Sequence, residues 1–118
     1  MSDTVGRKNG DKRLQELCGD LFDANKRAFA QRQYSVAFHA LAAAYHAALA
    51  LSDIEGLRRV EKLSREQLAW IDENAQHYEH STESAKTRGH HSVYATLASQ
   101  ASTRGGMLDH ERKYLGLR

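Results

Sequence analysis

The order of apolar and polar residues along the chain predicts helices joined by short polar turns. Apolar residues recur three and four positions apart between residues 14 and 29, which places them on one face of a helix. Asp11 stands just before this segment and can cap it, so the first helix is expected over about 11–30. Charged residues occupy most of its other side, so the helix should lie on a core with that side in water.

A second helix is expected from Tyr34 to Leu51, after the polar residues 31–33. Between Val36 and Leu51, 14 of the 16 residues are apolar, and the other two are His39 and His46. Apolar side chains go almost all round this helix, as is typical of a helix with neighbours on several sides. Eight of the 16 residues are alanine, and small side chains allow close helix packing. The second helix should therefore be central.

A capping box at residues 52–55 predicts that a third helix follows directly. The Ser52 hydroxyl can accept a hydrogen bond from the Glu55 amide, and the short turn makes the second and third helices antiparallel neighbours. The residues of the third helix expected to face inward are Leu57, Val60, Leu63, Leu68, Ile71, Ala75 and Tyr78.

Serine, threonine and histidine become frequent after His77. Helical spacing then returns and predicts a fourth helix over about 87–104, which Gly105 and Gly106 are expected to end. The expected organisation is a flexible polar leader over 1–10, a single helical domain over 11–104 and a C-terminal tail over 105–118 that can form a short docking helix. The fold class is all-α, with three to four antiparallel helices as hairpins or an up-down bundle.

Composition supports this fold and excludes several classes of protein. The 118 residues include 17 alanines and no proline, which favours long uninterrupted helices. An apolar content of 41% with 27% charged residues excludes a disordered chain. The net charge of +2 is spread along the sequence, so it offers no clustered basic face for nucleic acid.

The sequence also predicts a cytoplasmic location. Residues 1–10 are polar and charged, without the apolar stretch of a signal peptide. The apolar run from residue 36 to 51 is short and alanine-rich for a membrane span, so no membrane partner is expected. The lone Cys18 cannot form an internal disulfide and lies on the apolar stripe of the first helix. This predicts a buried thiol in a reducing compartment.

The first helical hairpin resembles a tetratricopeptide repeat unit. Tyr34 follows a polar turn, and Ala37 and Ala44 stand three and ten positions later, as in that family. The facing helix fits the pattern at Leu21, Ala24 and Ala28. The resemblance covers about residues 21–53 and implies a scaffold that presents a helical groove to a protein or peptide. Asn25 departs from the family, which has a glycine there; any tight helix pair would also need small residues at its crossing.

Arg32 and His39 carry a second resemblance on the same residues. Their Arg-x6-His spacing is similar to that of HEPN domains, small four-helix domains of which many are metal-independent ribonucleases that act as dimers. The resemblance implies that His39 serves as general acid or base and that Arg32 stabilises a developing phosphorane charge. The other interpretation is that His39 and His46 simply line one edge of the second helix.

His77, His80 and Glu83 recur at three-residue spacing and could share one helical face as metal ligands. A zinc site needs three or four convergent ligands, and the favoured interpretation is a solvated polar face. His39 and His46, seven residues apart, would suit either a cofactor between helices or hydrogen-bonded packing. We therefore assign no catalytic, cofactor-binding or metal-binding residue and expect no cofactor.

The predicted function is that of a small helical protein-interaction or scaffold module. The expected partner is a protein or peptide, including a second copy of the chain. Contacts are expected on the first and third helices or on the C-terminal segment rich in Ser, Thr and His. An enzyme is the minority alternative, because the sequence shows no glycine-rich phosphate loop, nucleophile elbow or paired-cysteine zinc spacing.

Overall fold

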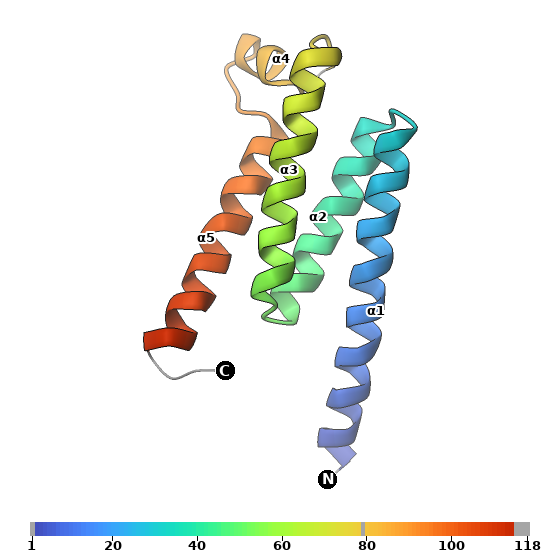
Figure 1. Ribbon diagram of the computed structural model, residues 1–118, viewed down its shortest axis with the longest axis vertical. Coiled ribbons are helices and arrows are strands. Elements are labelled where there is room, and N and C mark those ends of the chain that lie inside the picture. Colours follow the sequence, from blue (N-terminus) through green and yellow to red (C-terminus); the bar gives the residue numbers. More distant parts are fainter. Residues whose placement is uncertain (1, 79, 115–118) are drawn as a thin grey trace.

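The computed structural model describes residues 2–78 and 80–114, with side chains from residue 10 onward. The helices are α1 (Ser2–Ala30), α2 (Tyr34–Ala50), α3 (Ile54–Asn74), α4 (Thr82–Thr87) and α5 (Val93–Tyr114) (Figure 1). No strand occurs among these residues, so the predicted all-α fold is confirmed. The short α4 comes in addition to the long helices that the sequence predicts.

The four long helices stand side by side in chain order, each antiparallel to the one before it (Figure 1). α1 packs along α2, α3 packs along α5, and the contact of α2 with α3 joins the two pairs. The molecule measures 54 × 31 × 19 Å, so it is flat. A flat layer of helices has two broad faces, and residues on both faces are open to other molecules.

The core lies where the neighbouring helices cover α2. Leu41, Ala44 and Ala48 are fully buried, which confirms the central place predicted for the second helix. The other helices contribute Cys18 and Phe22 from α1, Leu57 and Val60 from α3, and Leu97 and Ala101 from α5.

Two buried amides link α1 to α3 through the core. Asn25 Nδ2 donates to Gln67 Oε1 at 3.1 Å, and Gln67 Nε2 donates to Asn25 Oδ1 at 2.6 Å. Asn25 Nδ2 also donates to the carbonyl oxygen of Ala37 on α2, at 2.7 Å. Because a buried amide without a partner is costly, the helices are stable only in the register that joins these groups.

The N-terminal helix begins earlier than expected. α1 starts at Ser2 instead of near Asp11, so the helix includes residues 2–10 of the segment predicted as a flexible leader; residue 1 lies outside the described residues. Periodicity detects only the part of a helix that packs on a core. Once formed there, a helix adds one hydrogen bond for each further residue and extends into polar sequence.

The cap of α3 lies one residue later than predicted. Ser52 has a positive φ of 52° and its amide donates to the carbonyl oxygen of Leu49, so it closes α2 in a left-handed conformation. The N-cap is Asp53, whose carboxylate accepts a hydrogen bond from the amide of Gly56 at 3.0 Å. The short antiparallel turn is as predicted, but Ser52 is not its capping residue.

The predicted helix over 87–104 is wrong at both ends. Thr87 belongs to α4, and the chain turns at Gly89, which has a φ of +74°, before α5 begins at Val93. Gly105 and Gly106 lie inside α5, which extends through most of the predicted tail to Tyr114; residues 115–118 lie outside the described residues. Packing of α5 along α3 outweighs the low helix propensity of two glycines.

Two glycines give opposite stability predictions. A Cβ at Gly106 would meet nothing within 4 Å, so Gly106→Ala should raise the free energy of unfolding by about 1 kcal/mol. A Cβ at Gly56 would lie 2.6 Å from the capping Asp53 Oδ2 and 3.1 Å from Ala48 Cβ, so Gly56→Ala should lower it by about 1–2 kcal/mol. Urea unfolding of both variants beside the wild type measures the two changes; equal effects at the two positions would contradict the prediction.

Candidate functional site

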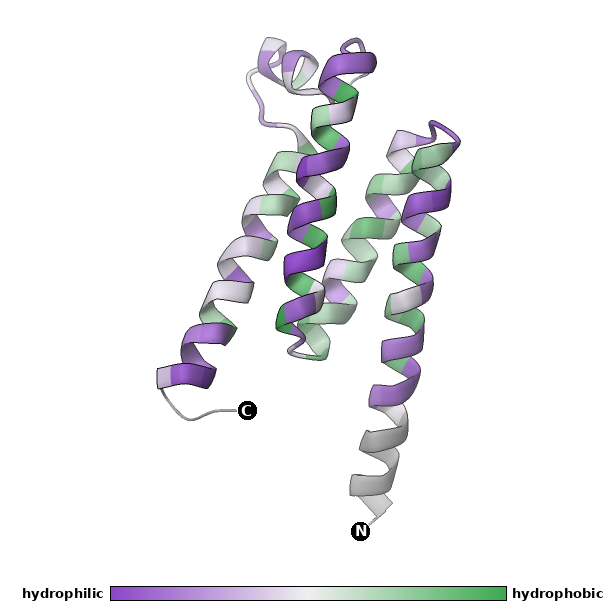
Figure 2. Ribbon diagram, viewed as in Figure 1, coloured by the Kyte–Doolittle hydropathy of each residue, from purple (hydrophilic) through white to green (hydrophobic). Residues whose placement is uncertain are grey.

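One stripe of α2 is left uncovered by the rest of the described chain. Val36 is 58% exposed, His39, His46 and Ala50 are exposed, and Ala43 is half-buried. These residues follow one another at spacings of three and four, so they form a single line along the helix. Figure 2 shows the weakly polar and apolar character of α2, in contrast with the strongly hydrophilic outer side of α3. α2 therefore has neighbours on several sides, as predicted, but not on this one.

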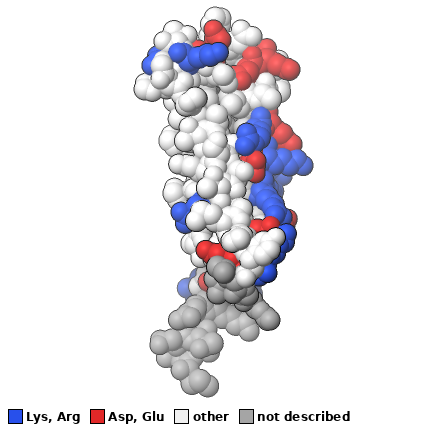
Figure 3. All heavy atoms as spheres, turned by 90° about the vertical axis from the view of Figure 1, so that its left-hand side faces the viewer, with Lys and Arg blue, Asp and Glu red and all other residues white. Residues whose placement is uncertain are grey.

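α5 continues the exposed, weakly polar surface of α2. Lys, Arg, Asp and Glu are absent from residues 33–52 and from residues 89–103. Figure 3 views the molecule from the α5 side and shows a broad uncharged surface in the middle, with charges gathered mainly along one edge and toward the two ends. We define the uncharged face as the exposed or half-buried residues Val36, His39, Ala43, His46 and Ala50 of α2 and Val93, Thr96, Gln100, Thr103 and Met107 of α5.

A groove of about 280 Å³ runs along the uncharged face between the two helices. Its lining residues are Phe38, Ala42, Tyr45 and His46 from α2, and Val93, Thr96, Leu97 and Gln100 from α5. Tyr45 and Leu97 are buried and form its floor, while Thr96 and Gln100 are exposed at its rim. The groove is thus apolar at its base and polar without charge at its edge.

Tyr94 fixes the two helices that form the groove. Its ring is fully buried and lies 5.4 Å, centroid to centroid, from the ring of Phe38. Its hydroxyl donates to the carbonyl oxygen of Tyr34 at 2.6 Å, which joins the start of α5 to the start of α2. Burial raises the pKa of the Tyr94 hydroxyl, so the group remains a donor at physiological pH.

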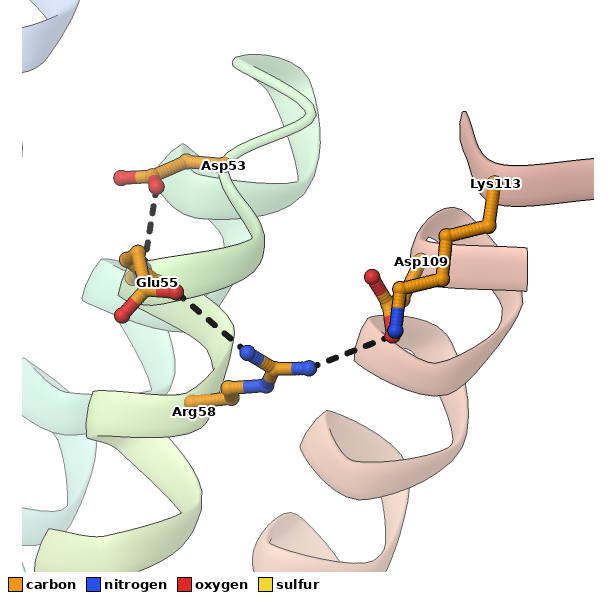
Figure 4. A network of polar contacts seen from close by, with 6 residues as sticks. Asp53, Glu55, Arg58, Asp109 and Lys113 are labelled. Carbon is orange, nitrogen blue, oxygen red and sulfur yellow. Dashed lines mark hydrogen bonds and ion pairs between the residues drawn. The ribbon is translucent and has the colours of Figure 1, made fainter. Parts of the chain in front are cut away.

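The outer side of α3 has the opposite character. Arg65 Nε lies 3.1 Å from Glu61 Oε2, and an ion pair of Arg58 with Asp109 joins α3 to α5. Arg58 lies 3.4 Å from both Glu55 and Asp109, and Asp109 also lies 3.3 Å from Lys113 Nζ. Figure 4 shows the Arg58 guanidinium between the carboxylates of Glu55 and Asp109. Exposed pairs contribute at most about 1 kcal/mol each. The charged groups on this surface are already paired and solvated, so it is less suitable for docking than the uncharged face.

A second pocket lies between α1 and the start of α3 and includes Cys18, Phe22 and Arg59. The guanidinium carbon of Arg59 is 4.2 Å from the centroid of the Phe22 ring. Cys18 is only 5% exposed, and burial is the main cause that raises the pKa of its thiol. The predicted buried thiol is confirmed, and its protonated sulfur is a poor nucleophile.

Arg32 and His39 contact different aromatic rings. Arg32 lies in the turn after α1 with a φ of 62°, and its guanidinium carbon is 5.9 Å from the centroid of the Trp70 ring on α3. His39 is exposed, and its ring contacts Phe38. The two side chains do not contact each other. The HEPN resemblance stays a prediction, which RNA cleavage by the wild type and His39→Ala without added metal would test.

His77, His80 and Glu83 do not share a helical face. α3 ends at Asn74, so His77 and His80 lie in the following turn while Glu83 is in α4. The alternative to the favoured solvated face, a common helical face of metal ligands, is therefore excluded, because the helix ends before these residues. Within residues 2–78 and 80–114, no group of three His, Cys, Asp or Glu side chains is placed to hold a metal ion.

Sequence reasoning missed the stripe on α2 because it placed the helix at the centre with neighbours on several sides. The usable signal was the complete lack of charge from residue 33 to 52. The groove does include residues of the C-terminal segment, where partner contacts are expected, but not the first and third helices.

Across the described residues, no helix has the length and apolar character needed to cross a membrane. No family model, curated protein or solved structure matches this chain.

Proposed function

We propose that this chain is a protein-interaction module that binds a protein or peptide segment through the uncharged face of α2 and α5. One observation carries the proposal. α2 is apolar nearly all round, yet its own fold covers it on only part of its circumference. A helix of this kind is ordinarily buried on all sides, so we expect a partner to bury the stripe from Val36 to Ala50.

The chemistry of the groove indicates what kind of segment it would bind. Its apolar floor at Tyr45 and Leu97 suits an aliphatic or aromatic side chain. Gln100 at the rim can donate and accept hydrogen bonds. A charged segment would lose hydration here without gaining an ion pair, so the favoured partner presents an uncharged surface.

The antiparallel pairing of α1 with α2 supports a scaffold role. Ala37 and Ala44, which match the tetratricopeptide pattern, are both fully buried, as residues at a close helix crossing would be. The free, buried Cys18 suits the reducing cytoplasm, which we propose as the location. In this role α1 and α3 provide a rigid base, and α2 with α5 presents the binding face.

A single charge placed in the groove should abolish partner binding. Gln100→Lys puts an ammonium group at the rim, where it would be buried by a partner without a counter-charge. Gln31→Lys makes the same chemical change at an exposed position in the turn between α1 and α2. With both variants and the wild type immobilised, we expect proteins captured by the wild type and by Gln31→Lys to be lost from Gln100→Lys. Circular dichroism checks that all three are folded, and an unchanged set of captured proteins with Gln100→Lys would contradict the proposal.

A further inference from the structure

The uncharged face is suited to bind its own equivalent. We propose that two copies of this chain pair through the uncharged faces of α2 and α5, related by twofold symmetry. This inference rests on the proposed function and names the partner. In a twofold interface each copy contributes the same patch, so the requirement is that the patch be complementary to itself.

Charge is the first reason for choosing a second copy. Soluble proteins usually distribute charges of both signs over their surface, and the centres of protein interfaces are depleted of charge. The outer side of α3 follows the first rule, with its pairs of Arg65 with Glu61 and Lys62 with Glu66. The uncharged face follows the second. Two such faces can meet without like-charge repulsion and without burying an unpaired ion.

The available area is the second reason. A standard interface buries about 800 Å² on each partner, which is close to one tenth of the 7956 Å² accessible surface of this chain. α2 has 17 residues, a length of roughly 25 Å at about 1.5 Å per residue. The outer sides of two of the four long helices are on the scale of such an interface.

The shape of the face is the third reason. Ala43 and Ala50 keep the ridge of α2 low, so a second helix can approach closely. Val36 and Met107 are 58% and 52% exposed, and the groove beside Tyr45 offers apolar surface that could receive such a side chain. Twofold pairing would place the ridge of each α2 near the α2–α5 groove of the other copy. It would thereby cover the stripe that the single chain leaves open.

The oligomeric state of the full chain tests this inference. Sedimentation velocity at pH 8, from low to high micromolar concentration, should show the wild type shifting from a mass of 13.3 kDa to twice that mass. Gln100→Lys should raise the dissociation constant by roughly 100-fold, while Gln31→Lys should leave it unchanged. A wild type that stays monomeric, or a Gln100→Lys variant that dimerises like the wild type, would overturn the inference.

Charge pairing adds a readout that misfolding does not imitate. Ala43→Lys/Gln100→Lys and Ala43→Glu/Gln100→Glu should each be monomeric, because the α2 ridge of one copy and the groove rim of the other then carry like charges. An equimolar mixture should form dimers again, because opposite charges then meet. A mixture that stays monomeric would overturn the placement of the two faces against each other.

The two proposals can fail separately. If the wild type is monomeric and Gln100→Lys still abolishes the capture of other proteins, the proposed interaction module is supported and a second copy is excluded as the partner. Captured proteins that are unaffected by the substitution would instead reject the uncharged face as the binding surface.

Discussion

Replacing Tyr94 with alanine is expected to lower the free energy of unfolding by about 3–5 kcal/mol. The Tyr94 side chain is fully buried, packs on Phe38 and donates to the carbonyl oxygen of Tyr34 at 2.6 Å. The substitution removes a large apolar volume together with the hydrogen bond to that carbonyl. Urea unfolding followed by circular dichroism measures the change, and a loss below about 1 kcal/mol would show that α5 does not depend on this anchor.

Tyr94→Phe distinguishes the contribution of the hydroxyl to stability from that of the ring. It keeps the packing and should cost about 1 kcal/mol at pH 8, the usual contribution of one hydrogen bond. The folded-state pKa of Tyr94 is raised by burial, whereas an exposed tyrosine titrates near about pH 10. Its contribution to stability is therefore present below that pH and is lost as the pH rises toward the folded-state pKa.

We accordingly expect the wild type to lose stability above about pH 10 and Tyr94→Phe to lose less over the same range. Other tyrosines and lysines titrate in both proteins, so the difference between the two curves reports on Tyr94. Parallel curves would contradict a buried, neutral hydroxyl at this position.

Replacing Asn25 with leucine is expected to lower the free energy of unfolding by about 3 kcal/mol. Asn25 is fully buried and makes hydrogen bonds with Gln67 and with the carbonyl oxygen of Ala37. Without Asn25, the Gln67 amide is left in the core with its polar atoms unpaired. That penalty exceeds the gain from an added apolar side chain.

A double-mutant cycle isolates the coupling between the two amides. Asn25→Leu/Gln67→Leu removes both polar groups, so it should be more stable than the sum of the single variants implies, by about 1–3 kcal/mol. Urea unfolding of the four proteins gives this coupling energy. Additive effects would show that the two amides are independent, in contradiction to their reciprocal hydrogen bonds.

Local sequence determined the class of fold and the first three long helices. The spacing of apolar residues such as Leu14, Leu21 and Phe22 depends only on the helical repeat, so it could be recognised without tertiary information. The alanine-rich run likewise identified α2 as the central helix without tertiary information. The polar turns before Tyr34 and after Leu51 also follow from local chemistry.

Helix ends and partners of buried polar groups could not be predicted in this way. Gly105 and Gly106 favour a helix end locally, but α5 continues through them along α3, with Gly105 facing Leu57. Asn25 and Gln67 are 42 residues apart, and no local pattern joins two single polar residues at that distance. Packing between helices outweighs propensity in the first case and creates the contact in the second.

The candidate site shows the same division between what the sequence determines and what the tertiary structure determines. The sequence by itself determined that α2 is apolar nearly all round and uncharged, which calls for cover on every side. Only the tertiary structure decided which side remains open, because α5 packs chiefly along α3 and leaves the stripe from Val36 to Ala50 without a neighbour among the described residues. Hydrophobic pattern specifies that a surface needs to be buried, but the number and placement of neighbouring helices determine whether the chain itself can bury it.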